Sequence, residues 1–336
     1  MENLYVNILG FAFCAGIIIL SGSKLSFYGD KIAELTGMGK AWVGLILMAS
    51  VTSLPELVTG ISSVAIVKAP DLAAGDIFGS CVFNLFILSV LDARLKFPLF
   101  SVVKSSHIVA VFMGIILLMV AGMAIYLSDE MPTILWISGF SIILLGGYLI
   151  SIWGIFKYEQ TLFIDSPSDK AIHLPPNPGE FKKVVGGYAL HAVIVLSAAL
   201  FLPYFGEHIA NHTGLGNSFF GTLFIAAATS LPELVVSLAA LKMGAVDMAV
   251  GNLLGSNVFN IFILALDDIF YKEGSLFNAI SPNHLFSIFI TIIMTAAVGL
   301  GLLFKPKKKQ LWLLSLDTFV LVFLYVILIL YLYSNK

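Results

Sequence analysis

The chain has 336 residues, of which 59% are apolar and 11% carry a charge. Ordinary soluble domains are about 45–50% apolar and about 25% charged, so this composition excludes a water-soluble globular protein. The net charge of −2 and the scattered Lys and Arg residues give no basic surface for DNA or RNA, so nucleic acid is excluded as a partner. Cys14 and Cys81 both lie in apolar runs, and their spacing fits no disulfide framework or CxxC motif.

Apolar runs between charged or turn-forming residues predict membrane-spanning helices, each of which needs about 20 residues. The fold class that we expect is therefore an all-α polytopic membrane protein with ten transmembrane helices. In chain order, the predicted spans are residues 5–22, 41–67, 72–92, 106–127, 132–156, 184–205, 217–240, 246–266, 284–304 and 311–333.

The longest polar stretch, residues 157–183, separates two groups of five predicted spans. It contains Ser166-Pro167, Pro175-Pro176 and Pro178-Gly179, a composition that breaks helices and is typical of a linker. We therefore expect a first five-helix repeat over residues 1–156, a cytoplasmic linker over 157–183 and a second five-helix repeat over 184–336.

Lys and Arg residues are distributed unevenly between the loops at the two ends of the predicted helices. Fifteen lie in one set of alternate loops, whereas the opposite set holds only Lys68, Lys272 and Lys336. Because positively charged loops stay in the cytoplasm, this distribution predicts that both termini lie outside it.

Two segments of the first half recur in the second half. Residues 49–57 (ASVTSLPEL) recur at 226–234 (AAATSLPEL), and residues 75–88 (GDIFGSCVFNLFIL) recur at 251–264 (GNLLGSNVFNIFIL). Two copies of one ancestral unit explain this. Because each unit has an odd number of spans, the second copy enters the membrane from the opposite side, which gives inverted-topology repeats with a pseudo-two-fold axis in the membrane plane.

The repeated motifs place oxygen-bearing side chains at helical spacing. A Thr and a Glu four residues apart lie on one helix face, and so do a Ser and an Asn on the following helix. The proline before each Glu kinks or breaks its helix and frees a backbone carbonyl, while the repeated glycines let neighbouring helices approach closely. The candidate ligands are Thr52, Ser53, Glu56, Ser80 and Asn84 from the first half, and Thr229, Ser230, Glu233, Ser256 and Asn260 from the second.

Two glutamates at membrane depth require an explanation, since an intramembrane ionisable group costs at least about 2.5–3.5 kcal/mol. A protonated Glu that is hydrogen-bonded between helices is the structural alternative. The motif Thr-Ser-Leu-Pro-Glu occurs twice, each time with a helix-breaking proline, and this favours an ion-binding site over a protonated structural Glu. Carboxylate, hydroxyl, amide and carbonyl oxygens are the ligands that Ca²⁺ prefers, whereas Mg²⁺ demands stricter geometry and no Cys/His cluster provides a zinc or copper site.

At these residues the chain resembles the calcium/cation antiporter superfamily, most closely the prokaryotic members of the sodium/calcium exchanger family. The resemblance covers residues 41–92 and 217–266 and extends to the ten-span inverted arrangement. It implies that all ten candidate ligands bind the ions, that the carbonyls of Ala49 and Ala226 help to bind sodium, and that the spans 5–22 and 184–205 slide across the other eight. It also implies Ca²⁺ and monovalent cations as substrates, no prosthetic group, a prokaryotic plasma membrane and a functional monomer.

The chain departs from the family pattern at two positions. Asn260 stands where Asp is common, and Gly75-Asp76 stands where Gly-Asn is usual. Two interpretations of Asp76 are open: it lines the entrance to the site, or it is a first-turn acid that the helix dipole favours. With Glu56 and Glu233 alone, charge balance predicts electroneutral exchange of one Ca²⁺ for two monovalent ions, whereas a third carboxylate makes room for three.

The function that we expect is antiport of Ca²⁺ against a monovalent cation, with Na⁺ favoured and an H⁺/Ca²⁺ antiporter as the alternative. A passive cation channel is a further alternative, and broken helices in inverted repeats argue against it. Neither HExxH nor GxSxG occurs, so we do not expect an enzyme. The acidic pairs Asp129-Glu130 and Asp267-Asp268 are interpreted as solvated loop residues, with attraction of cations toward an entrance as the alternative.

Overall fold

The computed structural model describes residues 4–36, 43–165, 178–211, 219, 221–311 and 313–334. Among these residues, nine helices are long and apolar enough to cross a membrane, and a bent pair completes a tenth span. The predicted all-α polytopic architecture is therefore confirmed. The first half contains α1 (Leu4–Thr36), η1 (Val43–Met48), α3 (Ala49–Thr52), α4 (Leu54–Ser62), η2 (Ser63–Val67), α5 (Pro70–Arg94), α6 (Leu99–Val102), α7 (His107–Tyr126) and α8 (Gly139–Asp165).

The second half repeats this order of elements. It contains α9 (Pro178–Asn211), η4 (Gly221–Ile225), α11 (Ala226–Thr229), α12 (Leu231–Lys242), α13 (Val246–Phe270), α14 (Leu276–Ala279), α15 (His284–Phe304) and α16 (Leu316–Ser334). The segments named η are π-helical. A two-stranded antiparallel hairpin, β1 (Thr133–Ile134) and β2 (Ile137–Ser138), precedes α8.

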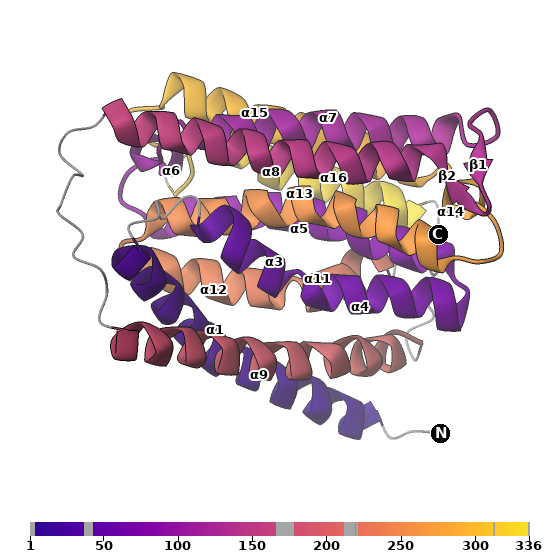
Figure 1. Cartoon of the computed structure of the whole chain (residues 1–336), viewed down its shortest axis with the longest axis horizontal. Helices are drawn as coiled ribbons and strands as arrows, with labels where there is room; N and C mark the ends of the chain where they lie inside the picture. The colour runs from indigo at the N-terminus through magenta and orange to yellow at the C-terminus, as the bar shows by residue number, and fades with distance from the viewer. Residues whose placement is uncertain are drawn as a thin grey trace.

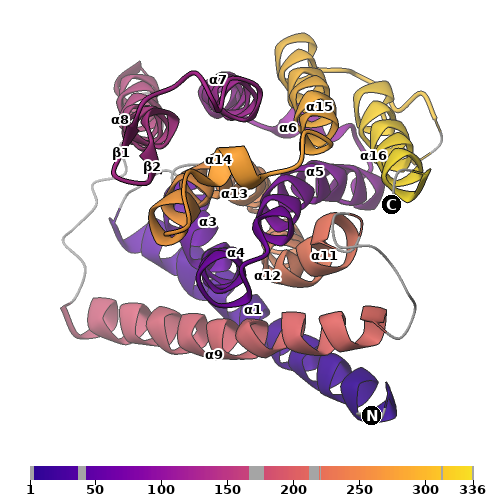
Figure 2. The same cartoon turned by 90° about the vertical axis from the view of Figure 1, so that its right-hand side faces the viewer.

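The helices form layers around a central pair (Figure 1, Figure 2). α5 and α13 lie at the centre, with 83% and 89% of their most apolar stretches buried inside the protein. The broken helices α3/α4 and α11/α12 lie beside them. α1 and α9 pack together on one side of this core, and α7, α8, α15 and α16 cover the opposite side. The candidate ligands therefore lie on the most enclosed elements.

Helix boundaries differ from the predicted spans mainly at the membrane surface. α1 continues beyond residue 22 to Thr36, and the span predicted from residue 132 begins with the β1–β2 hairpin. Both flanks of the predicted linker are helical, since α8 ends at Asp165 and α9 starts at Pro178. Hydropathy marks where a helix leaves lipid and not where its hydrogen bonds end, and proline is tolerated in the first helical position. Residues 166–177 of the linker lie outside the described residues.

Buried polar contacts follow the internal repeat. The Asp92 carboxylate accepts the backbone N–H of Leu99 at 2.7 Å, and its equivalent Asp268 accepts that of Leu276 at the same distance. Two acid–histidine pairs also recur, Asp71–His284 at 3.3 Å and Asp247–His107 at 3.4 Å. Each acid–histidine pair joins a residue of one half to a residue of the other half, and a pseudo-two-fold axis relates the two pairs.

One interpretation of the acidic pairs is wrong. Asp267 and Asp268 lie in the last turns of α13 and are fully buried, whereas Asp129 and Glu130 are exposed in a turn as expected. Asp268 is buried because its carboxylate holds the hairpin and the start of α14, through the N–H groups of Ser138 and Leu276. A run of two acids near a span end therefore did not mark a loop.

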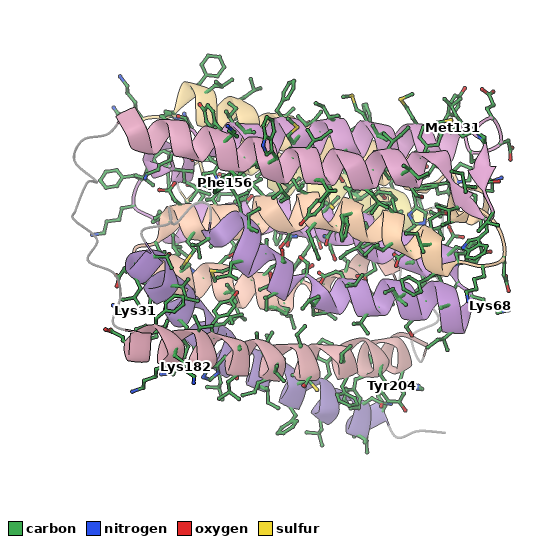
Figure 3. The ribbon with its side chains drawn as sticks, in the orientation of Figure 1. Lys31, Lys68, Met131, Phe156, Lys182 and Tyr204 are labelled. Carbon is green, nitrogen blue, oxygen red and sulfur yellow. The ribbon has the colours of Figure 1, made fainter. Side chains whose placement is uncertain are left out.

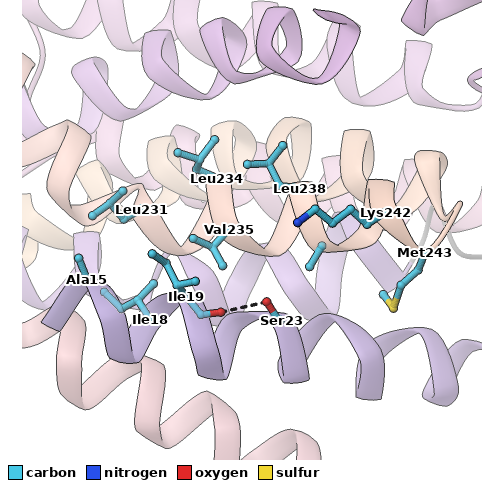
Figure 4. Close-up of a pocket in the computed structure, with 11 residues that line it drawn as sticks. Ala15, Ile18, Ile19, Ser23, Leu231, Leu234, Val235, Leu238, Lys242 and Met243 are labelled. Carbon is cyan, nitrogen blue, oxygen red and sulfur yellow. Dashed lines mark hydrogen bonds between the residues drawn. The ribbon is translucent and has the colours of Figure 1, made fainter. Parts of the chain in front are cut away.

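A cavity of about 490 Å³ separates α1 from α12 along part of their length (Figure 4). Its walls are mostly apolar, including Ile18, Ile19, Val235 and Leu238, and Lys242 lines it as well. The two helices touch at Gly22, where an added Cβ would lie 3.0 Å from a methyl carbon of Val235. α1 therefore packs against α12 over part of its length and borders this cavity along the rest.

Candidate ion-binding site

Two helices are interrupted at the repeated Thr-Ser-Leu-Pro-Glu motifs. α3 ends at Thr52 and α4 begins at Leu54, while Ser53 between them has φ −90° and ψ 8°. The second break, at Ser230, has φ −85° and ψ 7° and bends its span by 48°. The prolines lie in the first turn of α4 and α12, where a missing N–H does no harm. The predicted breaks are therefore found at Ser53 and Ser230, just before each proline.

Each glutamate lies in the first turn of the helix that follows the break. The free N–H groups and the dipole of a helix N-terminus stabilise a carboxylate there. Ser53 Oγ donates a hydrogen bond to Glu233 Oε1 at 2.9 Å, and Ser230 Oγ donates one to Glu56 Oε1 at 3.0 Å. These crossed bonds bring the two motifs together at the interface between the halves, with both carboxylates turned away from lipid and fully buried.

Several buried oxygens around the crossed bonds have no hydrogen-bond partner. The second carboxylate oxygens of Glu56, Glu233 and Asp76 are in this state, and so are the amide oxygens of Asn84 and Asn260. Burying a polar atom without a partner costs free energy, so such a cluster indicates a place that binds a ligand. Five unpartnered acceptors, three of them from carboxylates, have the chemistry to bind a hard cation.

The remaining candidate ligands are on α5 and α13, and all of them except Ser256 contact the other half. Ser256 Oγ donates to Glu233 Oε1 at 3.2 Å, and Ser80 Oγ lies 3.4 Å from Thr229 Oγ1. The amide nitrogens of Asn84 and Asn260 contact Asn257 Oδ1 at 3.1 Å and Cys81 Sγ at 3.8 Å. These contacts orient the two amide groups and leave their oxygens free.

The carbonyls of Ala49 and Ala226 are occupied by hydrogen bonds in this structure. The Ala49 carbonyl accepts the N–H of Ser53 at 3.0 Å and the hydroxyl of Thr52 at 3.3 Å. The Ala226 carbonyl accepts the equivalent groups of Ser230 at 3.0 Å and Thr229 at 3.2 Å. Each threonine hydroxyl has a single proton and lies closer to a second acceptor, Asp76 Oδ1 for Thr229 and Asn252 Oδ1 for Thr52, so the backbone N–H groups are the main donors to these two carbonyls.

Asp76 belongs to this polar group. Thr229 Oγ1 donates to Asp76 Oδ1 at 2.8 Å, and at the equivalent place Thr52 Oγ1 donates to Asn252 Oδ1 at 3.2 Å. Asp76 is fully buried and lies beyond the first turn of α5, which holds Asp71 instead. Its interpretation as a first-turn acid is wrong. Asn252 was not among the predicted residues, although the alignment of Gly75-Asp76 with Gly251-Asn252 contained the signal.

The glycines of the second motif allow backbone to meet backbone. A Cβ added to Gly79 would lie 2.4 Å from the carbonyl oxygen of Thr222, and one added to Gly255 would lie 2.2 Å from that of Leu45. The approach that the sequence predicted at these two positions is confirmed. It presses the segments that enter the breaks directly onto α5 and α13.

Among the described residues, no three His, Cys, Asp or Glu side chains are grouped closely enough to hold a metal ion by themselves. A cation here would therefore take neutral oxygens as well as carboxylates. We name as the central site the predicted ligands Thr52, Ser53, Glu56, Ser80, Asn84, Thr229, Ser230, Glu233, Ser256 and Asn260, together with Asp76.

The fold and the site define a class of membrane transporters that are built from inverted repeats with broken helices at the repeat interface. The family described as "Sodium/calcium exchanger protein" matches residues 6–160 and 183–334. The chain belongs to this family. It is an integral membrane protein and an antiporter of calcium and a second cation.

Individual relatives agree with this assignment. The chain is 30% identical over 251 residues to "Putative antiporter CaxA" of Alkalimonas amylolytica, covering 73% of this chain and 74% of that one. It is 38% identical over 108 residues to "Sodium/calcium exchanger MaX1" of Methanosarcina acetivorans, covering 29% and 31%. A solved structure of the sodium-calcium exchanger NCX_Mj, soaked with 100 mM Na⁺ and 10 mM Sr²⁺, has the same fold, with a TM-score of 0.72, 20% identity, and coverage of 98% and 99%.

Proposed function

We propose that the chain exchanges Ca²⁺ for Na⁺ by alternating access at the central site. The observation that carries this proposal is the pair of crossed bonds, Ser53 to Glu233 and Ser230 to Glu56, with a free carboxylate oxygen left on each glutamate. A calcium ion accepts 6–8 oxygens at about 2.3–2.6 Å, and two glutamates balance its charge. The same oxygens suit Na⁺, whose single charge needs fewer carboxylates at once.

The presence of Asp76 in the central site changes the expected stoichiometry. With three carboxylates, Glu56, Glu233 and Asp76, there is charge to balance three monovalent ions against one Ca²⁺. The cycle would then move one net charge, whereas the two-carboxylate argument from the sequence predicted electroneutral exchange. Thr229, which contacts Asp76, joins this third acid to the motif of the second half.

Movement of α1 and α9 across the core would open the site to alternate sides. The two helices pack mainly on each other and lie outside the layer that holds the site. The cavity beside α12 separates part of α1 from the core (Figure 4). α1 packs more extensively on α9 than on the core, and together with this cavity that difference favours motion of α1 and α9 as a unit.

The positive charges support one orientation in the membrane. Lys31 and Lys182 lie at one end of the helices and Lys68 lies at the other (Figure 3). α1 begins and α16 ends at the Lys68 end. The charge rule then places both termini outside the cytoplasm. With an inward sodium gradient, the exchange exports calcium across a prokaryotic plasma membrane, and the central site is complete within one monomer.

The test is uptake of radiolabelled calcium into proteoliposomes under separate Na⁺ and pH gradients. Wild-type protein should take up calcium when an outward Na⁺ gradient drives Na⁺ out of the vesicles, and Glu56→Gln should abolish this uptake. Glu130→Gln, which removes an exposed acid, should not change it. Uptake driven only by the pH gradient would assign H⁺ as the exchanged ion, and uptake without any counter-ion would show a channel.

A further inference from the structure

Asp267 is a buried carboxylate outside the central site. It lies near the end of α13, is fully buried, and neither of its oxygens has a hydrogen-bond partner. Its neighbour Asp268 is equally buried but accepts hydrogen bonds from two backbone N–H groups and a serine hydroxyl. The fold therefore explains Asp268 and leaves Asp267 without a structural role.

The internal repeat reinforces this contrast. The residue equivalent to Asp268 is Asp92, whereas the residue equivalent to Asp267 is Leu91, which is also fully buried. A leucine satisfies the packing at this place in the first half. The second half keeps an ionisable group there, although burying one inside a membrane protein is costly.

Asp267 lies between the central site and the end of the molecule that carries Lys68. A Cβ added to Gly60 of α4 would lie 2.5 Å from Asp267 Oδ2, and Gly60 is one helical turn beyond Glu56. Asp267 also follows Asn260 by about 10 Å along α13, at 1.5 Å per residue. The carboxyl group therefore fills the space that glycine leaves on the helix carrying a central-site glutamate.

The groups around Asp267 do not provide a counter-charge. The helices against this part of α13 bring Glu56 on α4, Asp76 on α5 and Tyr148 on α8. Asp76 is close enough to act on Asp267 electrostatically. The nearest cations in sequence are Lys272, which follows α13, and Lys68, which follows η2; both are exposed, and Lys68 pairs with Glu273. A metal ion needs several oxygens, and Asp267 offers one carboxylate, so a proton is the cation that this place can accept.

We propose that Asp267 carries an exchangeable proton that leaves when the side facing Lys68 opens and returns before that side closes. The proposal deepens the proposed function and rests on it. In the opened state the O–H bond of the carboxylic acid breaks, the proton passes to water on that side, and the electron pair stays on the carboxylate. The resulting negative charge attracts entering cations, and reprotonation allows the carboxyl group to be buried again without a partner.

The first test compares calcium flux over a range of external pH. Wild-type flux should fall about tenfold from alkaline to acid external pH, because protonation removes an attracting charge from the entrance. Asp267→Asn should give a flat profile at the acid wild-type level, and so should Asp267→Leu, which copies position 91. Glu130→Gln should keep the wild-type profile. Variants with the wild-type pH profile would overturn the proposal.

A second measurement does not depend on transport. Infrared difference spectra of the purified protein, recorded between acid and alkaline pH, should contain the carbonyl band of a protonated carboxylic acid that is missing from Asp267→Asn. An identical band in wild type and variant would overturn the proton assignment. If wild-type protein moved no calcium, the proposed function would fail, and the infrared result would still decide the state of Asp267.

Discussion

Ser53 and Ser230 each donate a hydrogen bond to the glutamate of the opposite half. Because each serine is the residue at which its helix breaks, its backbone conformation and its hydroxyl position are set together. The break therefore orients a hydrogen-bond donor, while the carbonyls beside it still accept backbone N–H groups. This explains why a short motif, rather than a larger cluster of acids, is enough to hold two carboxylates at one interface.

Replacing either serine with alanine should weaken calcium binding. A hydrogen bond to a charged group contributes about 1.5–3 kcal/mol, which corresponds to an increase of about tenfold or more in the calcium concentration for half-maximal uptake. Because the two bonds are pseudo-symmetric, Ser53→Ala and Ser230→Ala should have similar effects. Calcium titrations of sodium-driven uptake measure this. Unchanged affinity in both variants would show that the crossed bonds do not position the glutamates for calcium.

Asp76→Asn should remove the net charge movement of the exchange cycle. The variant makes position 76 equal to its equivalent Asn252 and leaves two carboxylates in the central site, enough for two monovalent ions. Calcium uptake should then lose its dependence on an imposed membrane potential, which wild type should show. Asn252→Asp is the matched control, because it adds an acid at the equivalent place. A wild type that ignores voltage would contradict the role given to Asp76.

At the scale of elements, the close contacts of α5 and α13 hold the broken helices in place. Gly255 and Gly79 meet carbonyl oxygens of the segments that lead into the breaks, so these segments have no room to move closer to α5 and α13. α5 and α13 thus act as the fixed support for α3/α4 and α11/α12. The central site depends on backbone contacts as much as on its ligands.

Gly255→Ala should destabilise the protein, because its Cβ would lie 2.2 Å from the Leu45 carbonyl and the backbone would have to shift. Overpacking of this kind costs about 1–3 kcal/mol. Gly146→Ala is the control, since an added Cβ there meets nothing within 4 Å and alanine is the better helix former. Thermal unfolding in detergent should show a lower midpoint for Gly255→Ala only. Equal midpoints would mean that the segment near Leu45 moves away easily.

The sequence predicted the helices and the breaks well, because both depend on local chemistry. Hydropathy located the spans, and proline located the interruptions near Ser53 and Ser230. Hydropathy could not predict that α1 continues to Thr36, because a helix does not have to end where it leaves the lipid. It also failed for Asp267 and Asp268, because burial of an acid near a span end depends on which loops fold over it.

The composition of the central site was predictable only in part. The repeat itself identified the paired glutamates, serines and threonines, whose convergence follows from inverted symmetry. The place of Asp76 depended on the crossing of α5 and α11, which brings Thr229 within 2.8 Å of its carboxylate. The spacing of residues within one helix does not predict a distance between two different helices. Asn257 was missed for the same reason, since Asn84 and Cys81, which it contacts, lie in the other half.

For the whole molecule, alternating access predicts that fixing α1 to the core stops transport. An added Cβ at Gly22 would lie 3.6 Å from the Cβ of Val235 on α12, within the range of a disulfide. Gly22→Cys combined with Val235→Cys should therefore lose calcium exchange on oxidation and regain it with a reductant. Each single variant should be insensitive to oxidation. Full exchange in the oxidised, cross-linked protein would show that α1 does not move relative to α12.

The crossed serine–glutamate bonds also bear on how such a molecule can be divided. Each half supplies the hydroxyl donor that the glutamate of the other half needs, so neither half alone can form the complete site. Two copies of one half inserted with the same orientation would not reproduce the inverted arrangement of the two motifs. Two polypeptides cut between residues 166 and 177 and produced in the same cell should therefore complement each other, and either fragment by itself should be inert in the calcium assay.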